Sequence, residues 1–389
     1  MSKESELELS RRRALSLVVA GVGVNACSRA EGPKGGPASL VAPARSLWST
    51  TNPVLQASPL PAGSTWETLD PFLFCAHHDD HYPPGNGAFG PRVSLAGRAL
   101  GQDFSGRDGF SMYHGLSVPG FPQHPHRGFE TVTVVRRGLL DHSDSLGAAA
   151  RFGEGDLQWL TAGAGIQHAE MFPLLGQASA NPLELFQIWL NLPQKNKMVA
   201  PYFSMFWSKD VPTRTFLDTR GRPCEVSLRA GDLEDMRAPT SPPHSWAKDP
   251  GNAVCIWTIK LGPGASWELP GALAGLNRSL YFFRGQSLTL NGVVAPTRHR
   301  LDLRSELRVR LENGPEESEL LLLQGRPIRE PIARRGPFVM NTDEEIRAAY
   351  YDYQATQFGG WPWPSEAPVH GGERQRFARH PDGRVERPG

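Results

Sequence analysis

Two short runs of the chain carry side chains suited to chemistry: His124-Pro125-His126 and, further along, His168-Ala169-Glu170. In each run one residue separates the two polar side chains, and residues i and i+2 of a β-strand point to the same face. Each run would therefore aim two potential metal ligands in one direction. If two such strands face each other inside a small barrel, three imidazoles and one carboxylate converge. That donor set suits a borderline transition metal such as iron, and it leaves positions for water or substrate.

A single His-x-His pair is weak evidence, because a chain of 389 residues with 12 histidines contains some close pairs by chance. Two observations strengthen the interpretation here. Both pairs have the periodicity of a strand, and both lie among short apolar segments that end at glycine turns.

The composition favours a turn-rich all-β protein, because it includes 41 glycines and 35 prolines, with 39% hydrophobic residues to form a core. The net charge is +1, and there is no basic run outside the N-terminus. We therefore expect no direct binding of nucleic acid. No pair of cysteines has C-x-x-C spacing, which excludes a zinc knuckle or a thioredoxin-type motif.

The N-terminus has the features of an export signal. Three arginines, Arg11 to Arg13, precede the apolar stretch Ala14 to Val24, which is too short to span a bilayer but suits a signal peptide. The arginines resemble a twin-arginine signal, and Val24-Asn25-Ala26-Cys27 resembles a lipobox, with Cys27 as the candidate lipidation site. Residues 1–27 thus predict a bacterial periplasmic or outer-membrane-attached lipoprotein. A disordered basic tail on a cytoplasmic protein is the alternative.

The rest of the chain divides by composition. Residues 28–65 are rich in Pro, Gly, Ala and Ser without a sustained period, which predicts a flexible linker. Short strand-like segments then fill residues 66–195, and after a connecting segment at 196–240 a second set fills residues 241–335. Residues 336–389 contain a short helix and a tail. The helix begins at a capping-box pattern, Thr342-Asp343-Glu344-Glu345.

The two sets of strands contain a similar segment. Val134 to Gly138 and Tyr281 to Gly285 both read as a strand, an arginine and a glycine turn, which indicates an internal duplication. Aligning the two glycines places His124 on Gly271, and the second half has no strand-like His-x-His. One barrel would therefore carry a metal and the other would not.

These residues resemble the pirin family over roughly residues 66 to 385. The resemblance depends on two long motifs, HPHRGFETVT at 124–133 and GDLQWLTAGAGIQHAEM at 155–171, and on LFQIWLNL at 185–192 and GPFVMNT at 336–342. It implies two consecutive cupin-type β-barrels (a bicupin) with a metal in the N-terminal barrel only. The export-like N-terminus departs from the family, whose familiar members are intracellular.

The resemblance implies that His124, His126, His168 and Glu170 bind one divalent transition metal. Iron is the metal it implies, although Cu, Mn, Ni or Zn could compete for such a site. Glu130 is the alternative carboxylate ligand, because it lies four residues beyond His126 and would share its face on a continuous strand. Its other possible role is to hydrogen-bond to the ligands and hold them in place. We rank Glu170 first, since it lies two residues from a ligand histidine on the same predicted face.

Two functions follow from the resemblance. The first is oxygen-dependent cleavage of a small aromatic, enolic substrate, as in a quercetin 2,3-dioxygenase, with Glu170 also acting as a general base. The second is a non-catalytic protein that senses metal or redox state and binds a protein partner. We expect a monomer that a lipid at Cys27 could anchor to a membrane.

Overall fold

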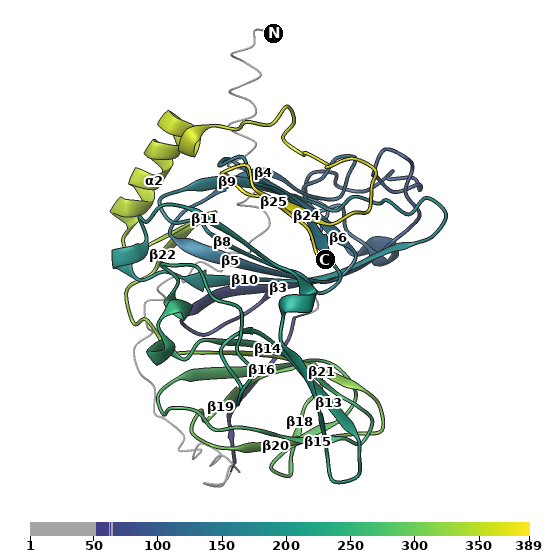
Figure 1. The fold of residues 1–389 in the computed structure, drawn as a ribbon, viewed down its shortest axis with the longest axis vertical. Coiled ribbons are helices and arrows are strands. Elements are labelled where there is room, and N and C mark those ends of the chain that lie inside the picture. Colours follow the sequence, from purple (N-terminus) through teal and green to yellow (C-terminus); the bar gives the residue numbers. More distant parts are fainter. Residues whose placement is uncertain (1–51, 62, 64) are drawn as a thin grey trace, which may run out of the picture.

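The computed structural model describes residues 52–61, 63 and 65–389 (Figure 1). The predicted export signal with Cys27, and most of the predicted linker, lie outside these residues. Two β-barrels stack on each other, and the C-terminal helix packs beside the first of them (Figure 1). Within the described ranges, no helix combines the length and apolar character needed to cross a membrane.

The first barrel is built from two six-stranded sheets with the orders β11-β8-β5-β10-β3-β2 and β25-β24-β7-β6-β9-β4. The alternation of side chains along β4, β5 and β9 lets each strand send one set inward, as expected for barrel strands. The bounds are β2 (Thr65–Trp66), β3 (Phe72–Tyr82), β4 (Gly120–His126), β5 (Phe129–Arg137), β6 (Leu139–Asp144), β7 (Ala149–Gly153), β8 (Leu157–Thr161), β9 (Ile166–Met171), β10 (Asn181–Asn191), β11 (Tyr202–Phe206), β24 (Phe377–Arg379) and β25 (Val385–Glu386).

The second barrel combines a seven-stranded sheet, β1-β19-β16-β21-β14-β13-β12, with a four-stranded sheet, β15-β20-β17-β18. A cluster of buried apolar side chains, among them Leu280, Phe282 and Leu322, forms its core. The bounds are β1 (Val54–Pro59), β12 (Thr213–Leu217), β13 (Pro223–Ala230), β14 (Cys255–Leu261), β15 (Ser266–Leu269), β16 (Asn277–Arg284), β17 (Leu288–Leu290), β18 (Val293–Ala295), β19 (His299–Leu303), β20 (Val309–Asn313) and β21 (Ser318–Gly325).

After the second barrel the chain returns to the first. A hairpin forms there, and the capping box that the sequence predicts begins helix α2, since the Thr342 hydroxyl accepts the Glu345 N–H. These elements, together with the six short 3-10 helices found in the described residues, are β22 (Ala333–Arg335), β23 (Phe338–Met340), α2 (Asp343–Thr356), η1 (Arg107–Gly109), η2 (Gln194–Asn196), η3 (Ser208–Asp210), η4 (Trp246–Lys248), η5 (Pro250–Asn252) and η6 (Gln357–Gly359).

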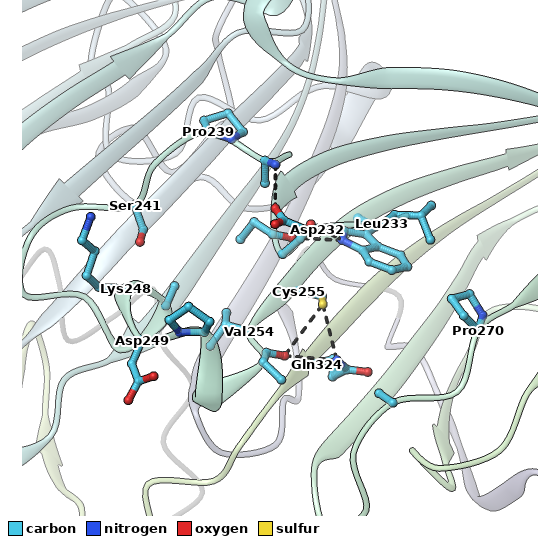
Figure 2. A pocket seen from close by; sticks show the side chains of 18 of the residues that line it. Asp232, Leu233, Pro239, Ser241, Lys248, Asp249, Val254, Cys255, Pro270 and Gln324 are labelled. Carbon is cyan, nitrogen blue, oxygen red and sulfur yellow. Dashed lines mark hydrogen bonds between the residues drawn. The ribbon is translucent and has the colours of Figure 1, made fainter. Parts of the chain in front are cut away.

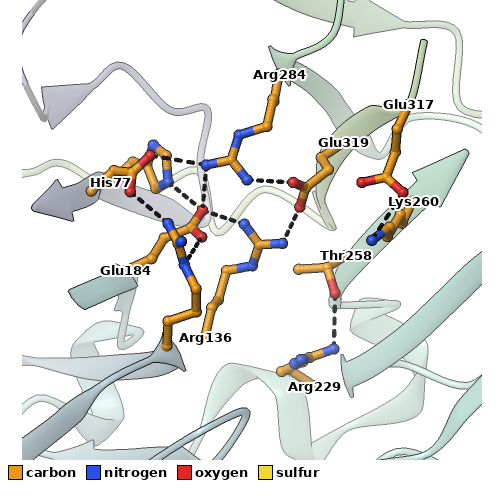
Figure 3. Close-up of polar contacts among 11 residues, drawn as sticks. His77, Arg136, Glu184, Arg229, Thr258, Lys260, Arg284, Glu317 and Glu319 are labelled. Atoms are coloured by element: carbon orange, nitrogen blue, oxygen red, sulfur yellow. Dashed lines mark hydrogen bonds and ion pairs between the residues drawn. The ribbon is translucent and has the colours of Figure 1, made fainter. Parts of the chain in front are cut away.

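The two barrels meet through matching sheets. The order β8-β5-β10-β3-β2 recurs as β19-β16-β21-β14-β13, which agrees with the duplication seen in the sequence. Apolar side chains of both sheets form one shared cluster. At its edge, Arg136 of β5 pairs with Glu184 of β10 and reaches Glu319 of the second barrel (Figure 3).

Three segments differ from the predictions. Residues 54–59, assigned to the linker, form β1 and pair with β19, because Val54 is buried in the core of the second barrel. The run at residues 76–81 has a polar composition typical of a loop, but it is the middle of β3. In the C-terminal tail, where the sequence predicts no strand, Phe377–Arg379 pairs with β7.

Candidate metal centre

Three histidines meet inside the first barrel. Strands β4 and β9 are antiparallel, and His124 lies directly opposite His168. The ring centroid of His168 is 4.4 Å from that of His124 and 4.8 Å from that of His126, and the other two are 4.8 Å apart. One nitrogen from each ring lies within 4.8 Å of the other two. Period-2 alternation on two neighbouring, hydrogen-bonded strands of one sheet produces this cluster.

Hydrogen bonds orient two of the rings. Nδ1 of His124 lies 2.8 Å from the Pro122 carbonyl, and Nδ1 of His126 lies 3.4 Å from the Pro337 carbonyl. A carbonyl can only accept, so Nδ1 carries the proton and Nε2 keeps its lone pair. This arrangement is the usual one for a metal-ligating histidine.

His168 provides the test of whether this site fits a metal. Its side chain is fully buried, and neither ring nitrogen has a hydrogen-bond partner among the described residues. Such an orphaned buried group needs an explanation, because its desolvation is not compensated. A metal ion bound between the three rings would compensate it. The donor set therefore fits a metal ion.

Burial keeps these imidazoles neutral. It lowers the pKa of His124 to about 4, and it lowers the pKa of His126 and His168 well below the ordinary value. Desolvation is the main cause, because it disfavours the charged ring. The neutral ring is the form that binds a metal, so no proton must be displaced near neutral pH.

Glu170 lies on β9 one alternation beyond His168 and is only 2% exposed. Its Oε2 accepts a hydrogen bond of 2.5 Å from Gln187, and its Oε1 accepts one of 3.3 Å from Thr133. Burial raises the pKa of this carboxyl group above its ordinary value. The group of converging ligand atoms comprises the three histidines without Glu170. A role for Glu170 as fourth ligand stays a prediction.

The structure does not bring Glu130 to this site. Its carboxylate accepts hydrogen bonds from Thr161, at 2.7 Å, and from Ser245 of the segment between the barrels, at 2.5 Å. Strand β4 ends at His126 and β5 begins at Phe129, so the intervening turn resets the alternation of faces. Phe129 contacts the His126 ring, and Glu130 consequently points to the opposite face of the sheet. A role for Glu130 beside the ligands therefore has no support.

Sequence reasoning missed the polar residues around the ligands. His142 is fully buried, lies directly across from Glu170 on β6, and has its ring centroid 5.6 Å from that of His168. Thr133 and Gln187 hold the carboxylate. Gln187 gave one usable signal, since it is the polar residue within the otherwise apolar stretch Leu185 to Leu190.

The C-terminal extension closes the barrel beside the ligands. Pro337 provides the carbonyl for His126, and the guanidinium of Arg334 lies 4.8 Å from the centre of the Trp189 ring. The Trp189 ring is in turn 5.3 Å from the His126 ring. The ammonium group of Lys197 joins Gly128, in the turn after β4, to the Val339 carbonyl. These contacts make the site depend on a segment distant in the sequence.

A second group of potential ligands comprises His77, Asp79 and Glu184. Its carboxylates are already paired, since Arg137 and Arg284 each contact both Asp79 and Glu184. Figure 3 shows the Arg284 guanidinium beside Glu184. Positive charges therefore surround the group, and they oppose the binding of a cation. We regard it as an ion-pair network that joins the barrels.

Comparison with known proteins agrees with this architecture. The chain matches the Pirin family over residues 55–190 and the Pirin C-terminal cupin domain over residues 256–359. It is 34% identical to a Pseudomonas aeruginosa protein named "putative quercetin 2,3-dioxygenase", over 61% of this chain and 79% of that one. It is 33% identical to mouse pirin, over 64% and 81% of the two chains. A crystal structure of quercetin 2,3-dioxygenase from Acinetobacter baumannii superimposes with a TM-score of 0.63 at 26% identity, covering 79% of this chain and 98% of that chain.

Proposed function

The chain belongs to the pirin family, and we propose that it is a metal-dependent dioxygenase that acts on flavonol-type, enolic aromatic substrates. The observation that carries the proposal is the buried, neutral histidine trio in which His168 has no other partner. The similarity to two proteins named as quercetin 2,3-dioxygenases supports the choice of substrate class. We propose iron as the metal, with Cu, Mn, Ni or Zn as alternatives.

In this proposal His124, His126 and His168 hold the metal. The bound ion would act as a Lewis acid toward an enol oxygen of the substrate. The carbonyls of Pro122 and Pro337 keep the first two rings in the tautomer that binds through Nε2. These fixed rings supply a preorganised site, so little reorganisation is needed when substrate arrives.

Glu170 is the proposed base for the hydroxyl proton of the substrate. Its raised pKa makes it a better proton acceptor than an exposed carboxylate. The amide of Gln187 and the hydroxyl of Thr133 fix the two oxygens of Glu170 in place. Each Glu170 oxygen accepts one of these hydrogen bonds and has a second lone pair, so it can receive the proton while the hydrogen bond is kept. Glu170 can act as the fourth ligand only if one of these oxygens turns toward the trio.

Aromatic side chains exclude water beside the trio. The rings of Phe129 and Trp189 lie 5.0 Å and 5.3 Å from the His126 ring, and their own centroids are 4.2 Å apart. Phe121 lies on the other side, with its ring 6.4 Å from that of His124. These faces could also pack against a flat aromatic substrate, because offset and edge contacts between rings are favourable.

Oxygen uptake by the metal-loaded protein tests the proposal. The protein is reconstituted separately with Fe²⁺, Mn²⁺, Cu²⁺ and Ni²⁺ and is then given a panel of flavonols. We expect turnover with at least one metal, a loss of at least a hundredfold in Glu170→Gln with metal retained, and normal turnover in Glu130→Gln, which alters a buried carboxyl group elsewhere. Metal-loaded protein that consumes no oxygen with any substrate would refute the enzymatic proposal and favour a non-catalytic, metal-sensing protein.

A further inference from the structure

A cavity of about 490 Å³ opens in the second barrel, away from the histidine trio (Figure 2). It lies between the ends of β13, β14 and β21 and the segment at residues 231–254 that crosses in front of them. Leu233, Val254 and Trp257 give it apolar walls. A volume of this size is in the range of pockets for small organic molecules.

The cavity has a counterpart in the first barrel. On its inner side, Arg278 of β16, Gln324 of β21 and Cys255 of β14 are neighbours across adjacent strands. The equivalent strands of the first barrel place Thr131, Trp189 and Phe74 side by side in the same order. Because Trp189 contacts the His126 ring, the cavity corresponds to the end of the first barrel that contains the trio. The corresponding ends of the two barrels thus differ in their chemistry: the first contains the histidine trio and the second the cavity with Arg278.

Arg278 is the feature that points to a ligand. Its side chain is 2% exposed, yet it lines the cavity. Nε donates to the Gln324 side chain at 2.6 Å and one terminal nitrogen, Nη1, donates to the Pro270 carbonyl at 2.9 Å. Across the part of the chain that the structure describes, Arg278 forms no ion pair and its Nη2 has no hydrogen-bond partner. A buried, unpaired charge is costly, and an anion bound in the cavity would compensate it.

The rim of the cavity narrows the choice of anion. Three exposed carboxylates, Asp232, Glu234 and Asp249, line it beside one exposed ammonium group, that of Lys248, so the rim has a net negative charge. These carboxylates repel a ligand with several negative charges, whereas one guanidinium can neutralise a single charge at the inner end. A planar carboxylate also matches the geometry of a guanidinium edge.

We propose that the second barrel binds a small monocarboxylate with an apolar body, its carboxylate on Arg278 and its body against Leu233, Val254 and Trp257. The site is separate from the histidine trio and does not depend on the dioxygenase proposal. It gives the second barrel a ligand-binding role of its own.

Calorimetric titration of the metal-loaded protein with benzoate tests this site. We expect saturable binding at one site per chain, with benzyl alcohol, the uncharged analogue, and inorganic phosphate each binding at least tenfold more weakly. Arg278→Gln should lower benzoate affinity at least tenfold. The matched control is Arg229→Gln, because Arg229 is also buried and has no ion pair within the described residues, but it does not line the cavity.

Two further variants make the outcome decisive. Ala238→Trp fills the cavity and leaves Arg278 in place, so it should abolish binding even if Arg278→Gln fails to fold. His168→Ala should leave benzoate affinity unchanged. The proposal is overturned if benzoate does not bind, if phosphate binds more tightly than benzoate, or if binding survives both Ala238→Trp and Arg278→Gln. It is also overturned if His168→Ala abolishes binding, since the benzoate would then be at the trio.

Discussion

Glu130 should make the stability of this protein fall as pH rises through the neutral range. Its side chain is fully buried, and burial raises its pKa from 4.5 to about 7, mainly by desolvation. Between these two values the folded chain keeps a proton that the unfolded chain has lost. Stabilisation from the protonated group is therefore complete below pH 4.5, and it is lost as pH rises through about 7.

The size of the effect follows from the two pKa values. One pH unit is equivalent to about 1.4 kcal/mol, so the loss from this group is about 3 kcal/mol at pH 8. Glu130→Gln removes the ionisation and keeps a side chain of the same shape, which can still bond the Thr161 and Ser245 hydroxyls. The free energy of unfolding of this variant, relative to the natural chain, should rise by about 3 kcal/mol between pH 4.5 and pH 8.

Guanidinium unfolding of both proteins at pH 4.5, 6 and 8, followed by tryptophan fluorescence, measures this difference. The comparison cancels the titration of the buried histidines, which both proteins share. A difference that stays constant with pH would refute the reasoning. Metal content measured on the same samples should be equal, and loss of metal from Glu130→Gln would make Glu130 a ligand and overturn its placement on the far face of the sheet.

Three further substitutions and one control, Gly147→Ala, test how the barrel interface and the site are supported. Arg136→Met removes a guanidinium that bridges two buried carboxylates across the barrel interface. Chemical denaturation should show a free energy of unfolding lower by about 3 kcal/mol. A loss under about 1 kcal/mol would mean that the remaining arginines are enough to compensate the two carboxylates. Lys197→Met leaves three buried acceptors without their donor, so we expect about 3 kcal/mol of destabilisation and weaker retention of metal against a chelator. Gly128 has φ +87°, and a Cβ at this position would lie only 1.9 Å from the Val339 carbonyl oxygen, so Gly128→Ala should lower the free energy of unfolding by more than about 3 kcal/mol. Gly147 has φ +85° but open space around it, so Gly147→Ala should lower it by about 1 to 2 kcal/mol. Equal losses in the two variants would contradict the close approach at Gly128.

The fold and the histidine trio were predictable because both depend on local alternation. The two-residue period of 124–126 and 168–170 defines which side chains share a face, whatever else the chain does. The family motifs then predicted two barrels, and the capping box predicted the start of α2. Both could be recognised because each motif is a contiguous segment of the sequence.

The predictions that failed concern segments whose structure depends on residues distant in the sequence or on the length of a turn. The polar run in β3 resembles a loop, but Arg137 and Arg284 neutralise Asp79 from two different barrels. Glu130 was expected on the face of His126 because four residues separate them, which holds only within one continuous strand. The turn at Arg127 and Gly128 interrupts the strand, so Glu130 lies on the other face. Strand β1 forms because β19, which is distant from it in the sequence and belongs to the second barrel, provides its hydrogen bonds.

Metal content provides the most direct test of the central claim, that His124, His126 and His168 bind one ion. The purified protein and single alanine variants of these three residues are analysed by elemental mass spectrometry after reconstitution with iron. His77→Ala is the matched control, because His77 belongs to the other cluster of potential ligands. We expect one metal per chain in the natural protein and in His77→Ala, and at least a tenfold loss in each trio variant. Full retention by His168→Ala, or loss from His77→Ala alone, would contradict the account.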